Sequence, residues 1–305
     1  MMTTMITDMD TRQSVSCSTT NNGSGVAGIN WNSQVIVSDL YGGSGKGDRV
    51  SLFSAIDSSI KAARATGKKV VFQGGVQGES WLNDGATQTQ LEQLIRDNSD
   101  IAFFAVAAGN GGPGGNLPNF QSNGWETSVS GLAKLETNNG NVISVGALTF
   151  SENVNGSWVN NPDINGQVIW NGQWVSHLED RNGFYNATSV RMSTYSNRGS
   201  NLTLVAPTDS PAMNKLGNMQ SFSGTSAANP NMAGIASLVW SVNSALTGGQ
   251  VRQILIDTAM DLGTTGRDNT FGNGLVNADA AVRRAWALQR DSQLANLYLG
   301  RSVMA

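Results

Sequence analysis

The feature that most constrains the fold is a regular alternation of short apolar runs and amphipathic helical segments. The segments at residues 48–67 and 89–100 have helical periodicity, and the first places its apolar residues on one face. These apolar residues are Leu52, Phe53, Ile56, Ile60 and Ala63, followed by Gly67 as a helix stop. The apolar runs occupy residues 34–40, 68–75, 101–110, 141–150 and 201–207. Continuous apolar strands joined by helices predict an α/β fold with a parallel sheet covered on both faces.

Residues 151–187 interrupt this alternation. They are rich in Trp, Val, Asn and Gly, and Asn-Gly pairs occur at 165–166 and 171–172. Asn-Gly is the preferred pair for two-residue hairpin turns. We therefore predict a β-hairpin insertion here, with the sheet resuming at residue 201 and a helical tail after residue 274.

The segment SFSGTSAANPNMAG, at residues 221–234, places a serine at the start of an apolar helix. Gly224 allows a tight turn, Thr225 or Ser226 can cap the helix, and Pro230 is expected near its first turn. The residues that follow are apolar nearly all round, which predicts a buried helix: Met232, Ala233, Ile235, Ala236, Leu238 and Val239. A serine at such an N-terminus is either a cap or a nucleophile whose oxyanion backbone N–H groups stabilise. The segment by itself leaves both interpretations open.

Several motifs resemble those of the subtilisin-like serine proteases, the subtilases. GTSAANPNMAG is similar to their serine motif, and AVAAGNGG, at residues 105–112, is similar to their oxyanion-hole segment. Further matches follow in the family order from about residue 21 to residue 284: NNGSGVAGINWNSQVIVSDL, NVISVGAL, TYSNRGSNLTLVAP, LTGGQVRQILIDTAMDLG and FGNGLVNADAAV. The resemblance implies a three-layer α/β domain, Ser226 as nucleophile and Asn110 as an oxyanion donor. It also implies an ester or peptide substrate.

The aspartate and histidine motifs of the subtilases are missing. The start of the chain, MMTTMITD, resembles the β-galactosidase leader of cloning vectors, and its alternative interpretation is a natural disordered terminus. We therefore expect residues 1–13 to be a vector-like leader and residues 14–305 to be a truncated subtilisin-like domain that lacks its first strands. The remaining strands, or another chain, would have to close the sheet. Open sheet edges favour pairing with a second copy, so a homo-oligomer is an expectation.

Three candidates remain for the base that activates Ser226. His177 is the single histidine and lies in the insertion. Asp8 and Asp10 lie where the family histidine would fall, and the related sedolisins pair their serine with acidic residues. The third candidate is no dedicated base, because oxyanion stabilisation and binding alone leave about a thousandfold catalysis. That residual rate would suffice for activated esters but not for peptide bonds. The run FQGGVQG at residues 72–78 also differs from the strand end that pairs with the peptide substrate in the family.

The composition argues against several kinds of binding partner. The net charge of -3 gives no basic footprint for nucleic acid, no apolar run is long enough to span a membrane, and the single Cys17 excludes an internal disulfide. No cofactor is expected to be required, although Asn22 resembles a ligand of a family calcium loop. The parent protein is expected to be secreted, by resemblance. Because this chain shows no signal peptide, it is expected in the cytoplasm when expressed. The functional prediction is a serine hydrolase acting on esters; the alternative is an inactive protease fragment with a structural or associative role.

Overall fold

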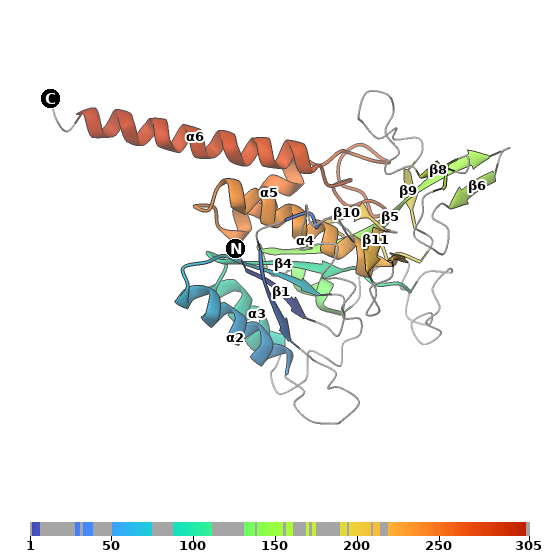
Figure 1. The fold of residues 1–305 in the computed structure, drawn as a ribbon, viewed down its shortest axis with the longest axis horizontal. Coiled ribbons are helices and arrows are strands. Elements are labelled where there is room, and N and C mark those ends of the chain that lie inside the picture. The colour runs from blue at the N-terminus through green and yellow to red at the C-terminus, as the bar shows by residue number, and fades with distance from the viewer. Residues whose placement is uncertain are drawn as a thin grey trace.

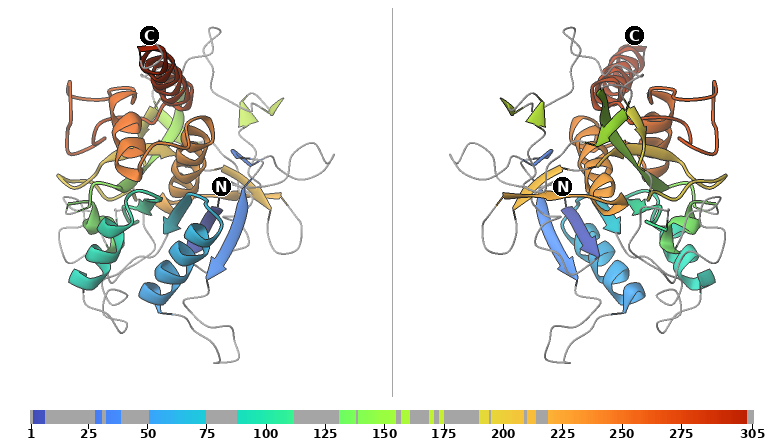
Figure 2. Two further views of the ribbon diagram at one scale, coloured as in Figure 1. Left: turned by 90° about the vertical axis from the view of Figure 1, so that its left-hand side faces the viewer. Right: turned by 90° about the vertical axis from the view of Figure 1, so that its right-hand side faces the viewer.

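The computed structural model describes residues 2–6, 28–30, 33–38, 51–74, 88–111, 131–137, 139–154, 157–160, 169–170, 173–174, 190–193, 195–208, 210–213 and 219–302. Helices cover both faces of a central sheet, which confirms the predicted three-layer α/β fold (Figure 1). One layer holds α2 (Leu52–Ala65) and α3 (Gln88–Asp97), and the other holds α4 (Thr225–Val242) and α5 (Gly248–Asp257). Figure 2 shows the two layers on opposite sides of the strands.

The central sheet has the strand order β10-β5-β4-β3-β1-β2, and every neighbouring pair on this path is parallel. Every residue of β3 and β4 is buried, which explains why these strands appear in the sequence as unbroken apolar runs. The strands on this path are β1 (Met2–Ile6), β2 (Gln34–Ser38), β3 (Val70–Gly74), β4 (Ala102–Ala107), β5 (Val142–Val154) and β10 (Leu204–Pro207).

The N-terminal segment forms an inner strand of this sheet. All five residues of β1 are in register with Gln34–Ser38 of β2 on one side and with Val70–Gly74 of β3 on the other. The sheet is therefore continuous from β10 to β2. The sequence analysis expected a gap in the sheet that the remaining strands or another chain would have to close, and in the structure β1 lies between β2 and β3. The vector origin of residues 1–13, and a domain boundary after residue 13, stay predictions.

Local sequence explains how α2 begins and ends. The Ser51 side chain accepts a hydrogen bond from the Ser54 backbone N–H at 3.1 Å and caps the helix. Gly67 adopts φ 63° two residues beyond the last helical residue and reverses the chain, as the sequence predicted. The buried face contains Leu52, Ala55, Ile56, Ser59, Ile60 and Ala63, while Phe53 is only partly buried.

The helix α4 is the buried centre of the other layer and packs on β3, β4, β5 and β10. Gly234 allows a close approach at its middle, because a Cβ there would lie 2.8 Å from the Ile29 Cβ. The neighbouring Asn30 amide donates a hydrogen bond to the Ser237 hydroxyl at 2.8 Å. The segment at residues 28–30 is thereby fixed along α4.

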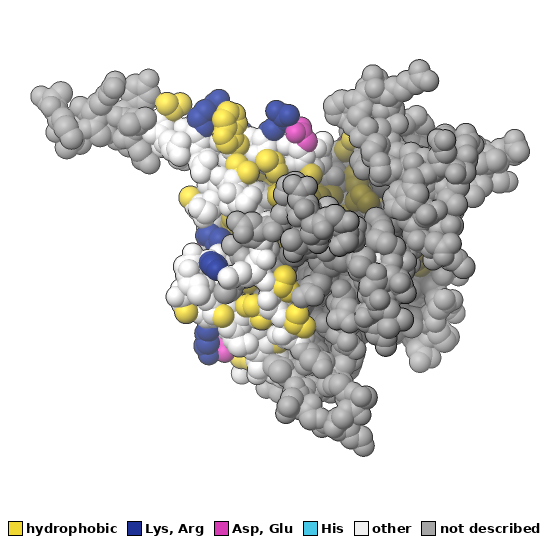
Figure 3. Space-filling view, in the orientation of Figure 1, with side chains coloured by type: hydrophobic (Ala, Val, Ile, Leu, Met, Phe, Trp, Pro, Cys, Tyr) yellow, Lys and Arg dark blue, Asp and Glu magenta, His cyan; other side chains and the backbone are white. Residues whose placement is uncertain are grey.

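The long helix α6 (Ala278–Ser302) begins against α4 and α5 and then extends away from the rest of the molecule (Figure 1). Hydrophobic and basic side chains lie side by side along it (Figure 3). The Trp286 side chain is 54% exposed, and the Arg290 guanidinium lies 5.4 Å from the centre of its ring. This helix confirms the predicted helical tail.

Antiparallel pairing occurs where the insertion was predicted. The distal half of β5 pairs with β6 (Ser157–Asn160), and β9 (Val190–Met192) returns beside β5. The two-residue strands β7 (Ile169–Trp170) and β8 (Gln173–Trp174) pair across positions 171 and 172, where an Asn-Gly turn was predicted. The other predicted turn, at 165–166, lies outside the described residues. The sequence did not predict a further antiparallel pair, β11 (Ser210–Met213) with β12 (Met219–Phe222), or the 3-10 helix η4 (Gly131–Thr137).

Candidate active site

The site lies at the C-terminal edge of the parallel sheet, where α4 begins. The cap of α4 is Gly224 rather than Thr225 or Ser226, which corrects the prediction of a hydroxyl cap. Gly224 has φ 88°, a conformation that only glycine adopts without strain, and as a glycine it offers no side chain of its own to cap the helix. Ser226 is thus the second helical residue. A capping role, the simplest structural explanation for this serine, is therefore excluded.

Pro230 also lies deeper than predicted, as the sixth residue of α4. A helical residue at this position would normally donate its N–H to the carbonyl four residues earlier, which here belongs to Ser226. Proline has no N–H, so the first turn lacks this bond. The burial of the following residues compensates, because the apolar residues from Met232 to Val239, except the partly exposed Leu238, are buried in the core.

Asn110 follows β4 and is attached directly to the start of α4. Its side-chain oxygen accepts hydrogen bonds from both the backbone N–H and the hydroxyl of Thr225, each at 2.8 Å. A backbone N–H can only donate, so these contacts require the oxygen on this side and leave the Asn110 NH₂ group on the other. A Cβ built on Gly224 would lie 3.1 Å from Asn110 Nδ2, so this amine faces the turn before Ser226.

The loop that carries Asn110 is fixed from two further directions. The Gly109 N–H donates to the Thr225 hydroxyl at 3.2 Å, so Thr225 connects the end of β4 to α4. The Gly111 N–H donates to the Asn197 side-chain oxygen at 2.9 Å, and the Asn197 N–H donates to the Gly109 carbonyl at 2.9 Å. The position of the Asn110 side chain is therefore fixed by hydrogen bonds within the protein.

Two residues that the sequence analysis did not single out, Tyr195 and Thr208, hold the Gly224 backbone in a ring of hydrogen bonds. The Thr208 hydroxyl donates to the Gly224 carbonyl at 2.9 Å, and the Gly224 N–H donates to the Tyr195 oxygen at 3.1 Å. The Tyr195 and Thr208 oxygens are 3.1 Å apart. Because the Thr208 proton is already used, Tyr195 must be the donor between them. The ring runs in one direction, an arrangement in which hydrogen bonds polarise and strengthen one another.

Ser226 is partly exposed at the positive end of the α4 dipole. Within the described part of the chain, neither its hydroxyl nor its backbone N–H has a hydrogen-bond partner, because the first turn of a helix leaves its N–H groups unbonded. The Ala227 N–H, by contrast, donates to the Gly224 carbonyl at 2.9 Å. With respect to the described residues, the site therefore presents an unbonded Ser226 hydroxyl, an unbonded Ser226 backbone N–H and the NH₂ group of Asn110.

A second residue of α4 stands out by its burial. The Asn229 side chain is fully buried one turn after Ser226, and neither its oxygen nor its nitrogen has a partner among the described residues. A buried amide without hydrogen bonds is costly and uncommon. The sequence signal that could have found it is a polar residue inside an otherwise apolar helix.

Of the sequence-predicted site residues, the structure brings Asn110 against Gly224 and Thr225, the two residues that precede Ser226. His177, Asp8, Asp10 and Asn22 lie outside the described residues. Among the described side chains, no group of acidic, histidine or cysteine residues is arranged to hold a metal ion. The helices that the structure describes include none with both the length and the hydropathy of a membrane span.

The fold and the site define an α/β domain with a partly exposed serine at the N-terminus of a buried helix, beside a fixed asparagine. The sequence profile of the Subtilase family matches residues 14–274, and the chain belongs to this family.

Three relatives illustrate the range of similarity. The chain is 44% identical over 92 residues to alkaline elastase YaB of Bacillus sp. (strain YaB), covering 30% of this chain and 24% of that protein. It is 40% identical over 92 residues to subtilisin Savinase of Lederbergia lenta, covering 30% of this chain and 33% of that protein. It is 26% identical over 265 residues to subtilisin DY of Bacillus licheniformis, covering 86% of this chain and 73% of that protein. The stronger matches thus span about a quarter to a third of the length of those relatives.

Proposed function

We propose that this protein is a serine hydrolase that transfers acyl groups through Ser226. The Ser226 oxygen attacks the carbonyl carbon of the substrate, its proton goes to a base, and the leaving alcohol or amine takes up a proton as the acyl-enzyme forms. Water then repeats the sequence and releases the acid. Family membership and the names of the relatives, which include proteases and an elastase, support this reaction class.

The observation that carries the proposal is the pair of donors beside the serine. Among the described residues, neither the Ser226 backbone N–H nor Asn110 Nδ2 has a hydrogen-bond partner, whereas Asn110 Oδ1 and the Thr225 N–H and hydroxyl are all bonded. Each donor of this kind stabilises a tetrahedral oxyanion by about 3–4 kcal/mol in acyl-transfer sites. Asn110 is fixed through its oxygen, so little reorganisation would be needed for it to donate.

We propose esters, rather than peptide bonds, as the preferred substrates. The chain lacks the aspartate and histidine motifs of the family, so proton transfer from Ser226 is expected to be inefficient. An activated ester has a good leaving group and depends less on general acid catalysis than an amide does. The measurement is the ratio of turnover on a p-nitrophenyl ester to turnover on a peptide anilide. A ratio typical of a complete subtilisin would contradict the ester preference.

The base remains a choice between His177, Asp8 and Asp10, or none. The strand β1 runs parallel to β3 and β4 and ends at Ile6, at the same edge of the sheet as the end of β4. The variants Asp8→Asn, Asp10→Asn and His177→Gln, compared through the pH dependence of ester hydrolysis, separate the alternatives. Loss of the ionisation in one variant alone identifies the base, and an unchanged profile in all three favours catalysis without one.

The test of the nucleophile is intact-mass labelling with a fluorophosphonate probe. We expect single-site labelling of the native chain and none of Ser226→Ala. The matched control is Ser223→Ala, which removes an exposed hydroxyl three residues away and should label at the native rate. Absence of labelling in the native chain would support the alternative, an inactive fragment with a structural or associative role.

A further inference from the structure

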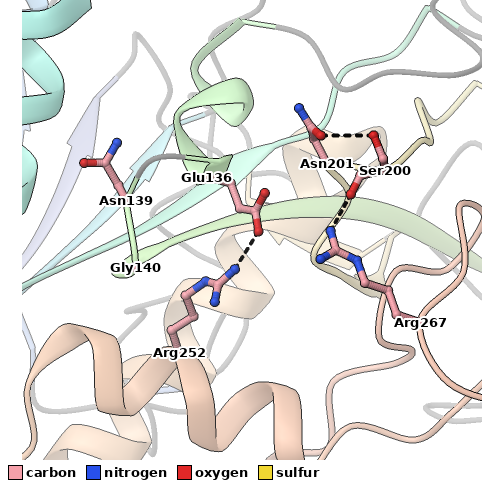
Figure 4. A pocket seen from close by; sticks show the side chains of 7 residues that line it. All are labelled: Glu136, Asn139, Gly140, Ser200, Asn201, Arg252 and Arg267. Carbon is pink, nitrogen blue, oxygen red and sulfur yellow. Dashed lines mark hydrogen bonds and ion pairs between the residues drawn. The ribbon is translucent and has the colours of Figure 1, made fainter.

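A pocket lies at the opposite edge of the sheet from Ser226. Its volume is about 410 Å³, and its walls come from η4, from the turns that precede β5 and β10, and from α5 with the loop after it (Figure 4). Asn139 and Gly140 lie just before the first residue of β5, whereas Asn110 follows the last residue of β4. The two sites are thus separated by the length of the strands.

Two guanidinium groups, from Arg252 and Arg267, extend into this pocket from different elements (Figure 4). Arg252 on α5 is held by its Nε, which donates to the Val142 carbonyl at 2.9 Å, and by its Nη2, which donates to Glu136 Oε1 at 2.5 Å. The Glu136 side chain is 7% exposed and that of Arg252 is 19% exposed, so this ion pair is largely buried.

Arg267 is held from the other side. Its Nη2 donates to the Leu202 carbonyl at 3.2 Å and also to the Ser200 carbonyl. A guanidinium has five N–H donors. Within the described residues, each arginine uses two of them and has about three left. Both cations are therefore fixed in place with donors to spare.

The pocket carries more positive than negative charge. Glu136 is its single acidic lining residue among those the structure describes, and it is paired with Arg252. The acidic residue that follows Arg267 in the sequence, Asp268, accepts hydrogen bonds from the backbone of its own turn. Its Oδ1 accepts from the Thr270 and Phe271 N–H groups, both at 2.7 Å, and its Oδ2 accepts from the Thr264 N–H at 3.1 Å. No acidic group in the described part of the chain forms an ion pair with Arg267.

We propose that this pocket binds a small oxyanion, a carboxylate or a phosphate group, between Arg252 and Arg267. The planar fork of arginine matches the paired oxygens of both groups and binds them with charge-assisted hydrogen bonds. Glu136 balances the charge of Arg252, and the bound anion would balance that of Arg267. The proposal does not depend on the chemistry at Ser226.

The experiment is a thermal melt of the full chain during titration with sodium phosphate, with sodium chloride replaced to keep the ionic strength constant. We expect the melting temperature to rise with the logarithm of the phosphate concentration once that concentration exceeds a dissociation constant of about a millimolar. In Arg267→Gln the concentration at which this rise begins should increase by about tenfold or more, and Arg267→Lys should fall between the two. The matched control, Arg283→Gln, removes an arginine whose side chain is 77% exposed on α6 and should leave the response unchanged. A parallel titration with acetate shows whether carboxylate or phosphate binds more tightly.

Phosphate also stabilises proteins without binding, because it is excluded from their surfaces, and that effect grows in proportion to concentration and does not depend on Arg267. An equal response in the native chain and in Arg267→Gln would therefore overturn the proposal. So would a response of the native chain that is strictly proportional to phosphate concentration, without the logarithmic dependence of a binding site. Because Arg267→Gln also loses two contacts to backbone carbonyls, calorimetric titration at 20 °C, where the variants are folded, provides the second measurement. No saturable heat with phosphate or acetate in the native chain would overturn the proposal.

Discussion

Replacement of Thr4 by proline tests the position of the N-terminal strand. Thr4 is the middle residue of β1 and is in register with Ile36 of β2 and Phe72 of β3. The N–H of an inner strand residue points to one neighbour or the other, so proline at Thr4 removes a ladder hydrogen bond on whichever side it points. Proline also forces its ring against the adjoining strand.

The expected cost follows from these two effects. Loss of the bond with an unsatisfied buried carbonyl costs about 1–3 kcal/mol, and the steric conflict brings the total to about 3 kcal/mol or more. For a domain of this size, each kcal/mol lowers the melting temperature by roughly 2–4 °C, so a decrease of roughly 6–12 °C is expected. The assay is a thermal melt followed by circular dichroism.

The matched control is Thr4→Val, which keeps the backbone N–H and the β-branched shape and should melt within about 1 °C of the native chain. If residues 2–6 were a leader outside the domain, the proline would cost nothing. Melting of Thr4→Pro within about 2 °C of Thr4→Val would therefore refute the inner-strand position.

Three further predictions concern the site and the surface. Gly224→Ala places a Cβ 3.1 Å from Asn110 Nδ2, at a residue with φ 88°. This variant should slow fluorophosphonate labelling by about a hundredfold. Labelling at the native rate would show that Asn110 does not stabilise the oxyanion. Tyr195→Phe breaks the ring of hydrogen bonds at Gly224 and should lower kcat for an ester more than it raises KM. Thr208→Val breaks the same ring and should have a similar effect, whereas Thr208→Ser keeps the hydroxyl and should show native kinetics. Burial would raise the pKa of Asp100, but the hydrogen bond and charge of Arg64 outweigh it and lower this pKa. Asp100 therefore stabilises the fold above its unfolded pKa of about 3.9, and this contribution is lost as the pH falls through the lower folded value. The pair is about half exposed, so Asp100→Asn should cost at most about 0.5 kcal/mol at pH 7 and nothing near pH 2, as measured by urea unfolding at both pH values.

The sequence predicted those parts of the fold that depend on local periodicity. The strands β3 and β4 are buried on both faces, and α2 has one apolar face, so each leaves a pattern within its own residues. The strand β1 has no such pattern, because its five residues are placed by pairing with segments about 30 and 70 positions away. Its position is a tertiary effect that local pattern does not contain.

The same distinction applies to the site. Asn110 and Ser226 were found because each lies in a motif that resembles a known family. Tyr195 and Thr208 were not, because their contacts with Gly224 join residues 29 and 16 positions apart. The cap of α4 was misassigned for a related reason. Thr225 has the chemistry of a cap, but in the folded chain Asn110 takes up its hydroxyl and Gly224 makes the turn.

The inner position of β1 has a consequence for synthesis on the ribosome. β1 is made before both of its partners, and β3 ends at Gly74, so β1 has no complete set of partners until about 70 more residues are made. At 5–20 residues per second this takes roughly 4–15 s, during which the edge of β1 that pairs with β3 is open. Early folding of this protein should therefore be sensitive to translation speed and to chaperones that bind extended segments such as β1.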